Sequence, residues 1–179
     1  LCDEEGLAFD RAVNDKLKGI ERALSLQIIA EHAGIIIPQA TFDAMLVRKN
    51  DYYRQSLSEF GPGDLFPQVD RLLAELRDAR LKIGLASASR NARDLIRRLG
   101  IESCFDHIAD AAQIVRGKPH PDIFLETAAA MDVLPERCIG IEDSNAGISA
   151  IRSAGMLAIG IGDSAQLPEA DVHFEKTGQ

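Results

Sequence analysis

Two adjacent carboxylates, Glu142 and Asp143, follow the short apolar run 138–141 and precede a helical pattern that begins at Asn145. This order predicts a strand, a turn and a helix, with both carboxylates at the carboxyl end of the strand. Ligands of open α/β sheets bind beyond those ends. Two hard oxygen ligands beside a helix N-terminus suit a Mg²⁺ ion next to a phosphate group. An acidic turn that only caps the next helix is the alternative, and the motif taken alone favours it.

A second strand end carries hydroxyl groups and positive charge. Residues 82–86 form an apolar run, and Ser87, Ser89, Arg90 and Asn91 follow it. Hydroxyls, backbone N–H groups left open by small residues, and an arginine together predict a phosphate cradle, with Asn91 able to cap the next helix. A turn capped by serine and asparagine explains the same residues equally well.

A lysine, Lys118, is held between Gly117 and Pro119 just before a helical pattern that begins at Asp122. Near two carboxylates and a phosphate, its ammonium would offset the accumulated negative charge. The alternative is a solvated loop lysine. For a catalytic Lys118 we expect little contribution to packing, so that its replacement reduces turnover and leaves the fold intact. If the three segments converge, they suit metal-assisted phosphoryl transfer, although none of them supplies an obvious nucleophile.

The pattern of elements divides the chain in two. Residues 1–60 carry only helical patterns, one over 12–29 that stops at Gly34 and one from Pro38 to about residue 57. Residues 61–64 read as a hinge. Strands then alternate with helices of about ten residues, which indicates parallel βαβ units. We therefore expect an α/β fold, a doubly wound parallel sheet over 61–179, with a small helical cap domain over 1–60.

Composition excludes several classes of function. The 179 residues are 46% hydrophobic, enough for a real core, and the formal net charge of −8 argues against non-specific binding of nucleic acid or an anionic membrane surface. No apolar run approaches the ~20 residues of a membrane span. Three scattered cysteines read as thiols of a reducing compartment, and four scattered histidines argue against a zinc site. We expect a cytoplasmic monomer.

Taken together, the segments resemble the haloacid dehalogenase superfamily of phosphotransferases. Residues 85–89, 118–119 and 141–147 resemble its second, third and fourth motifs, in the same order and spacing. Within the superfamily, residues 17–25 and 48–52 resemble the cap segments of sugar phosphomutases. The resemblance implies interconversion of β-glucose 1-phosphate and glucose 6-phosphate through an aspartyl-phosphate and a sugar bisphosphate. Alternatives are a sugar-phosphate phosphatase of the same superfamily and a catalytically dead fragment or phospho-ligand binder.

The resemblance also implies roles for individual residues. Ser87 and Lys118 would be catalytic and bind the phosphoryl group in transfer, with Lys118 also pairing the nucleophilic carboxylate. Glu142 and Asp143 would complete the coordination of Mg²⁺, Asp143 more directly. Arg22 would hold the second phosphate. The remaining substrate contacts implied are Lys18, Ser25, Lys49, Ala88, Ser89, Arg90 and Asn91.

Several positions depart from the pattern of the superfamily. Glu21 replaces a small hydroxyl residue, and a competing ion pair with Arg22 is expected to weaken phosphate binding. Gln68 replaces a more usual glycine, and Arg90 stands where lysine is common. Asn50, like Lys49, matters only if its helix closes over the site.

The largest departure is the superfamily's first motif, which should precede Leu1. It supplies the aspartate nucleophile, the aspartate acid/base and a central strand. We expect an N-terminal segment outside this sequence in preference to a truncated product. Without that segment, the 179 residues are expected to be inactive and to leave two strand edges unpaired.

Overall fold

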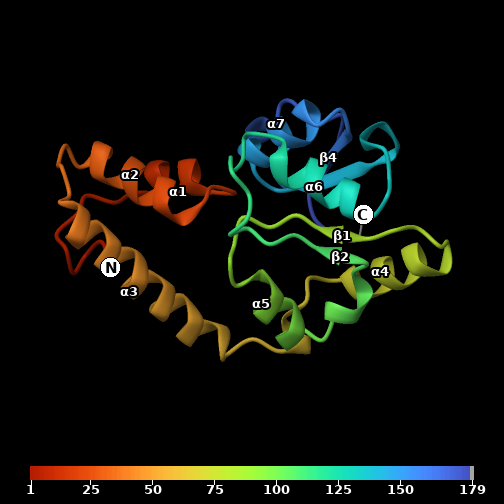
Figure 1. The fold of residues 1–179 in the computed structure, drawn as a ribbon, viewed down its shortest axis with the longest axis horizontal. Helices are drawn as coiled ribbons and strands as arrows, with labels where there is room; N and C mark the ends of the chain where they lie inside the picture. Colours follow the sequence, from red (N-terminus) through yellow and green to blue (C-terminus); the bar gives the residue numbers. More distant parts are fainter. Residues whose placement is uncertain (178–179) are drawn as a thin grey trace.

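The computed structural model describes residues 1–177 of the chain. Its elements form a helical unit, residues 1–60, and an α/β unit, residues 61–177, which lie side by side (Figure 1). The chain passes from one unit to the other through the short turn η1 (Pro62–Asp64). Every strand within residues 1–177 belongs to the α/β unit, as the change of sequence pattern near residue 61 predicts.

The helical unit consists of α1 (Arg11–Leu17), α2 (Arg22–His32) and α3 (Gln39–Leu57). Each helix buries apolar side chains, among them Val13, Leu26 and Met45, and α2 packs against both α1 and α3. The apolar pattern over 12–29 makes two helices and not one, because Gly19 adopts a left-handed φ of 74° that no helix interior allows. The break leaves a loop between α1 and α2 that points at the α/β unit (Figure 1).

The α/β unit alternates helices with short strands, as its sequence predicts. Its helices are α4 (Val69–Asp78), α5 (Ala92–Arg98), α6 (Asp122–Ala130) and α7 (Asn145–Ser153). Its strands are β1 (Gly84–Leu85), β2 (His107–Ile108), β3 (Ile139–Glu142), β4 (Leu157–Ile161) and β5 (Val172–Phe174). Three short turns, η2 (Glu102–Cys104), η3 (Pro135–Arg137) and η4 (Ser164–Gln166), are not evident in the pattern.

The strands form two parallel sheets, one with the order β1-β2 and one with the order β3-β4-β5. Helix α6 packs against β1, β2 and α7, so it joins the two sheets, while α4 and α5 lie on the other side of β1 and β2 (Figure 1). The predicted α/β class with parallel strands is confirmed. Within residues 1–177, β1 pairs only with β2 and β3 only with β4, which confirms the expected pair of open strand edges.

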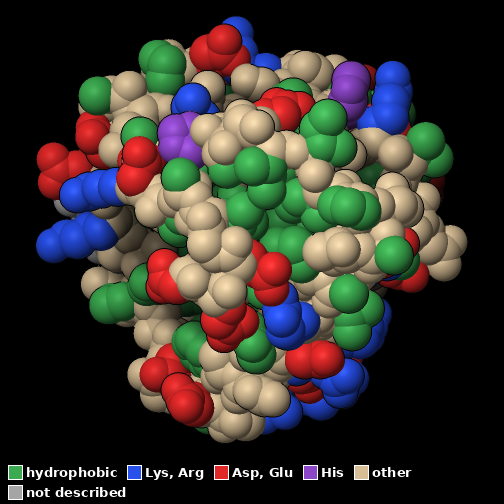
Figure 2. Space-filling view, turned by 90° about the vertical axis from the view of Figure 1, so that its left-hand side faces the viewer, with side chains coloured by type: hydrophobic (Ala, Val, Ile, Leu, Met, Phe, Trp, Pro, Cys, Tyr) green, Lys and Arg blue, Asp and Glu red, His purple; other side chains and the backbone are tan. Residues whose placement is uncertain are grey.

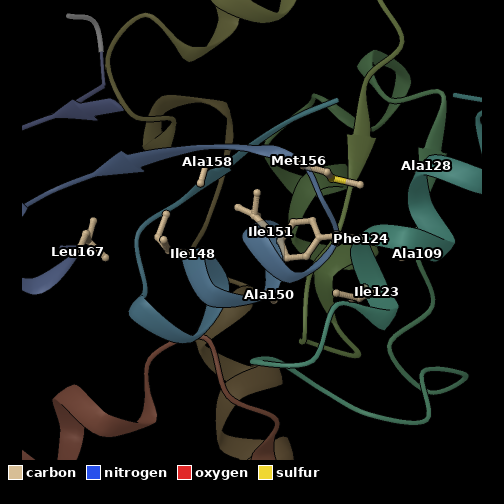
Figure 3. Packing of buried hydrophobic residues seen from close by; sticks show 11 residues of the cluster. Ala109, Ile123, Phe124, Ala128, Ile148, Ala150, Ile151, Met156, Ala158 and Leu167 are labelled. Atoms are coloured by element: carbon tan, nitrogen blue, oxygen red, sulfur yellow. The ribbon is translucent and has the colours of Figure 1, made fainter. Parts of the chain in front are cut away.

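A single apolar cluster holds α6 and α7 to the strands. Ile148 and Ile151 of α7 are fully buried and face Phe124 of α6 and Ala158 of β4 (Figure 3). Burying such side chains contributes about 1.5–3 kcal/mol each, so this cluster fixes where α7 begins. The start of α7 is the position next to the two carboxylates that end β3.

The opposite face of the larger sheet is open. Ile139, Ile141 and Leu157 are 62%, 51% and 45% exposed, and the strand register places them on one face because side chains alternate along a strand. On another side of the molecule, the one at the left of Figure 1 where the helical unit lies, hydrophobic side chains gather in the middle with charged side chains around them (Figure 2). No helix within residues 1–177 is long and apolar enough to cross a membrane.

Gln68, where the resemblance leads us to expect glycine, precedes α4 with a φ of 66°. A side chain in this left-handed region costs roughly 1–2 kcal/mol, while glycine loses about 0.4–1 kcal/mol through its freer unfolded chain. Gln68→Gly is therefore expected to raise the free energy of unfolding by about 1 kcal/mol, measured by urea titration. Gln68→Ala, which keeps the strain, serves as the control and should change little. Equal stability of the glycine and alanine variants would contradict a strained Gln68.

Candidate active site

Glu142 ends β3 with both carboxylate oxygens engaged. One oxygen pairs with the Lys118 ammonium, and the other accepts the Ser144 hydroxyl at 2.9 Å. Ser144 in turn accepts the Gly147 N–H at 3.1 Å and so caps α7. Gly147 carries no side chain, and any side chain there would overlap the Glu142 carboxylate. The last residue of β3 and the first turn of α7 are thereby locked together.

Lys118 is buried, in contrast to the solvated loop lysine that its sequence neighbourhood also allowed. Its side chain is 5% exposed and that of Glu142 is 9% exposed. The ammonium also lies 5.0 Å from the centre of the Phe124 ring, whose face attracts a cation. Burial makes each charge dependent on the other, because an unpaired buried charge is costly. The expectation that this lysine contributes little packing is therefore wrong.

Asp143 differs from its neighbour, because it is exposed and its carboxylate has no hydrogen-bond or ion-pair partner among residues 1–174. Two oxygen ligands fit Mg²⁺, which commonly binds to one or two carboxylates and keeps waters or takes substrate phosphate for the rest. No cluster of three or more acidic, histidine or cysteine ligands occurs in the described part of the chain. Glu142 and Asp143 thus fit part of a magnesium site, with Asp143 the freer ligand.

The loop after β1 forms a turn stabilised by serine hydroxyls, which is the second of the two structures that the sequence of residues 87–91 allows. The Ser87 hydroxyl accepts the Ser89 N–H, and the Ser89 hydroxyl accepts the Asn91 N–H, both at 3.2 Å. Each hydroxyl hydrogen remains able to donate, so the turn is compatible with a phosphate cradle. No hydrogen bond within residues 1–177 joins Ser87 to Lys118. Ala88 lies half-buried in the same turn.

Asn91 occupies the N-cap position of α5, as the sequence predicts, but its side chain makes no capping hydrogen bond. Its side-chain amide donates instead to the Asn50 carbonyl oxygen on α3, at 2.8 Å. The loop after β1 is therefore tied to the helical unit. The bond is invisible in the sequence, because the two asparagines are 41 positions apart and belong to different units.

A hollow of about 350 Å³ lies where the two units meet. Arg22 at the start of α2, Asn50 of α3 and Arg90 of the α/β unit line it. Partial burial lowers the pKa of Lys49, and the nearby Arg22 guanidinium lowers it further. Neither arginine nor Lys49 has an ion-pair partner among residues 1–174. The hollow therefore offers two guanidinium groups that can bind an anion, although the carboxylates of Glu21 and Asp43 also line it.

The other two residues predicted on the helical unit have local partners. Lys18 pairs with Asp15 at 2.9 Å on the exposed surface of α1. The Ser25 hydroxyl donates to the Glu21 carbonyl oxygen at 3.1 Å, inside the first turn of α2. Neither residue lines the hollow.

Glu21 does not form the expected competing ion pair with Arg22. Its carboxylate turns back on its own helix and accepts the Ala23 N–H at 3.0 Å, capping α2. A carboxylate at a helix N-terminus is favourable on its own account. The cap leaves the Arg22 guanidinium available, so the predicted weakening of phosphate binding by that route is wrong.

The loop between α1 and α2 touches the α/β unit at two places. A side chain on Gly19 would approach the Ser144 Cβ to 2.9 Å, and one on Gly117 would approach the Glu21 Cβ to 3.7 Å. The helical unit thus lies directly on the segments that carry Lys118 and Glu142. The close approach at Gly19 was missed from sequence, where the only signal was a glycine within a helical pattern.

Known proteins share this sequence and fold over nearly the whole chain. The sequence pattern of haloacid dehalogenase-like hydrolases matches residues 8–155. A β-phosphoglucomutase of Bacillus subtilis is 43% identical over 99% of this chain and 79% of its own length. A phosphorylated carbohydrates phosphatase of Thermotoga maritima is 27% identical over 87% of this chain and 71% of its own length.

Among solved structures, a β-phosphoglucomutase from Clostridium difficile superimposes with a TM-score of 0.96 at 39% identity, over 99% of this chain and 81% of that one. In this chain Glu142 ends β3, Ser87 follows β1, and Lys118 lies in the loop that precedes α6. With a sequence match over most of its length, this chain belongs to the haloacid dehalogenase-like hydrolases.

Proposed function

We propose that the full-length protein is a Mg²⁺-dependent phosphomutase of the β-phosphoglucomutase type, which interconverts β-glucose 1-phosphate and glucose 6-phosphate through a sugar bisphosphate. The observation that carries the proposal is the pair of arginines, Arg22 of the helical unit and Arg90 of the α/β unit, which line one hollow and have no ion-pair partner among residues 1–174. A phosphatase needs one phosphate site, whereas a mutase must also hold the phosphate that is not being transferred. The similarity to two β-phosphoglucomutases supports the same conclusion.

In this proposal the phosphoryl group in transfer binds Lys118 and the Ser87 hydroxyl. Lys118 releases Glu142 in part and neutralises the phosphoryl oxygens as charge develops on them. Glu142 and Asp143 hold Mg²⁺, which supplies further charge neutralisation at the same phosphoryl group when it is bound. Ser89, Arg90 and Asn91 follow Ser87 and contact the substrate from the same loop.

The nucleophilic carboxylate is proposed to come from a strand outside these 179 residues. The open edges of β1 and β3 support this proposal, because a parallel strand between them would join the two sheets. Its carboxyl end would lie between the Ser87 loop and Glu142. An aspartate there can accept a phosphoryl group from one sugar phosphate and return it to the other hydroxyl of the sugar.

Residues 1–60 are proposed to act as a cap domain over the core formed by residues 61–177. Arg22 and Lys49 bind the second phosphate, and Lys18 and Ser25 support the same face. Closure of the cap excludes water, so the phosphoryl group passes to a sugar hydroxyl in preference to hydrolysis. A cytoplasmic location and a monomeric state are part of the proposal; the free thiols Cys2, Cys104 and Cys138 support only the reducing compartment.

The products of the full-length protein test the function. With β-glucose 1-phosphate, Mg²⁺ and a trace of β-glucose 1,6-bisphosphate, we expect glucose 6-phosphate in large excess over inorganic phosphate, followed by coupled assay and phosphate assay. α-Glucose 1-phosphate serves as the control for the anomer. Release of inorganic phosphate without glucose 6-phosphate would decide for the second candidate, a sugar-phosphate phosphatase, which the phosphatase among the relatives supports.

Replacement of Lys118 tests its burial and its role together. Lys118→Met keeps the packing but strands the Glu142 carboxylate, so the free energy of unfolding should fall by about 3–5 kcal/mol. Turnover should fall by about 10²–10³-fold. Adding Glu142→Gln should restore most of the stability and none of the activity.

Lys82→Ala is the matched control, because the Lys82–Asp106 pair is 56% and 37% exposed and contributes at most about 1 kcal/mol. Denaturant titration and initial rates give both readouts. Unchanged stability of Lys118→Met would contradict the buried pair, and unchanged turnover would contradict the catalytic role.

Gly19→Ala tests closure of the helical unit. The new Cβ would overlap Ser144, so we expect the cap to close incompletely. Water then competes with the sugar hydroxyl, and the ratio of inorganic phosphate to glucose 6-phosphate should rise about tenfold or more. Gly34→Ala is a close control, because Gly34 also has a positive φ, of 67°, but open space around it. The prediction fails if both variants change the product ratio equally, since backbone strain would then be the cause.

A further inference from the structure

One side-chain hydrogen bond ties the helical unit to the α/β unit. Of the hydrogen bonds and ion pairs within residues 1–174, the bond from the Asn91 amide to the Asn50 carbonyl oxygen alone joins residues 1–60 to residues 65–174. Its donor–acceptor distance of 2.8 Å is that of a well-formed bond. The remaining contacts across the junction are close packing without directed bonds, so this bond has a disproportionate share in orienting the two units.

The bond lies at the hollow. Asn50 lines it, and Asn91 directly follows Arg90, which lines it from the other unit. Both asparagines are half-buried, which limits competition from water. A side-chain amide has two N–H hydrogens, so the Asn91 nitrogen can donate to Asn50 and to an anion at the same time. Orientation of this amide is thus coupled to the approach of α3.

We propose that Asn50 is a positioning residue that latches the cap over the core and aims the Asn91 amide at the bound phosphate. Asn50 does not touch the reacting phosphoryl group; it acts through Asn91. The proposal deepens the proposed mutase function and rests on it for its catalytic consequence. Loss of the latch lets water compete with the sugar hydroxyl, whereas binding of the phosphoryl group at Lys118 is untouched.

The first measurement is independent of catalysis. Hydrogen exchange of the full-length protein with saturating Mg²⁺ and β-glucose 1-phosphate is compared for wild type and Asn50→Ala, in peptides covering 17–22 and 114–120. These segments meet only when the units are together. Exchange is expected to rise about two- to tenfold there, the range for one neutral hydrogen bond, and to stay unchanged inside α2 and α3.

Matched variants isolate the bond. Gln39→Ala removes an exposed hydrogen bond, to Asp43, within the same helix α3, and should leave exchange at both peptides unchanged. Asn50→Asp keeps an acceptor oxygen at the same place and should restore protection. Asn91→Ala should mimic Asn50→Ala, and the double variant should exceed either by little, because both singles break one bond.

The second measurement is the product ratio. Asn50→Ala should raise the ratio of inorganic phosphate to glucose 6-phosphate by about two- to tenfold and leave the rate of protein phosphorylation unchanged. Unchanged exchange in Asn50→Ala would overturn the latch, and so would a rise spread through all of α2 and α3, which would indicate a folding defect. If wild type makes no glucose 6-phosphate, the mutase proposal fails, and the exchange data still decide the latch.

Discussion

Lys118 and Glu142 are buried as an ion pair, and this pair constrains the positions of the loop, strand and helix around it. A lysine at the end of one loop and a glutamate at the end of β3 are both nearly enclosed, so each must keep the other within reach. Ser144 extends the constraint into α7, and the apolar cluster of Ile148 and Ile151 holds α7 against the strands. The site is therefore positioned by the core and not by a flexible loop. A pre-positioned charge is what transfer of a phosphoryl group requires, because no reorganisation remains to be done as charge develops.

The junction between the two units supplies the second requirement of a mutase. Positive charge gathers there from both sides, with Arg22 on one unit and Arg90 on the other. At this junction the backbone of Gly19 lies against Ser144, where a side chain would overlap, and the Asn91 amide donates a hydrogen bond to Asn50. A chain with a net charge of −8 can still bind an anion at such a place, because Arg22 and Arg90 have no ion-pair partner among residues 1–174, although Glu21 and Asp43 line the same hollow.

Much of the fold could be predicted because its signals are local. The turn residues and apolar spacing predict α3 and β4 almost to the residue. The central strand that the resemblance places before Leu1 predicts two open strand edges, which are those of β1 and β3. Two predictions, a capping side chain at Asn91 and little packing at Lys118, were wrong because they depended on contacts with residues distant in the sequence. Asn91 looks like a helix cap until α3 offers it Asn50. Likewise, a loop lysine looks solvated until Phe124 and Glu142 enclose it. The predicted ion pair between Glu21 and Arg22 failed for a local reason: the Glu21 carboxylate accepts a backbone N–H at the N-terminus of its own helix.

The proposed enzyme binds two phosphates at opposite ends of one site, one at Lys118 and the other at the junction of the two units. A crystal structure of the full-length protein with Mg²⁺ and β-glucose 1,6-bisphosphate tests this most directly. We predict one phosphate within hydrogen-bond distance of the Lys118 ammonium and the other within hydrogen-bond distance of the Arg22 guanidinium, with Asn50 still bonded to Asn91. A bisphosphate whose second phosphate points into solvent, away from Arg22, would contradict it.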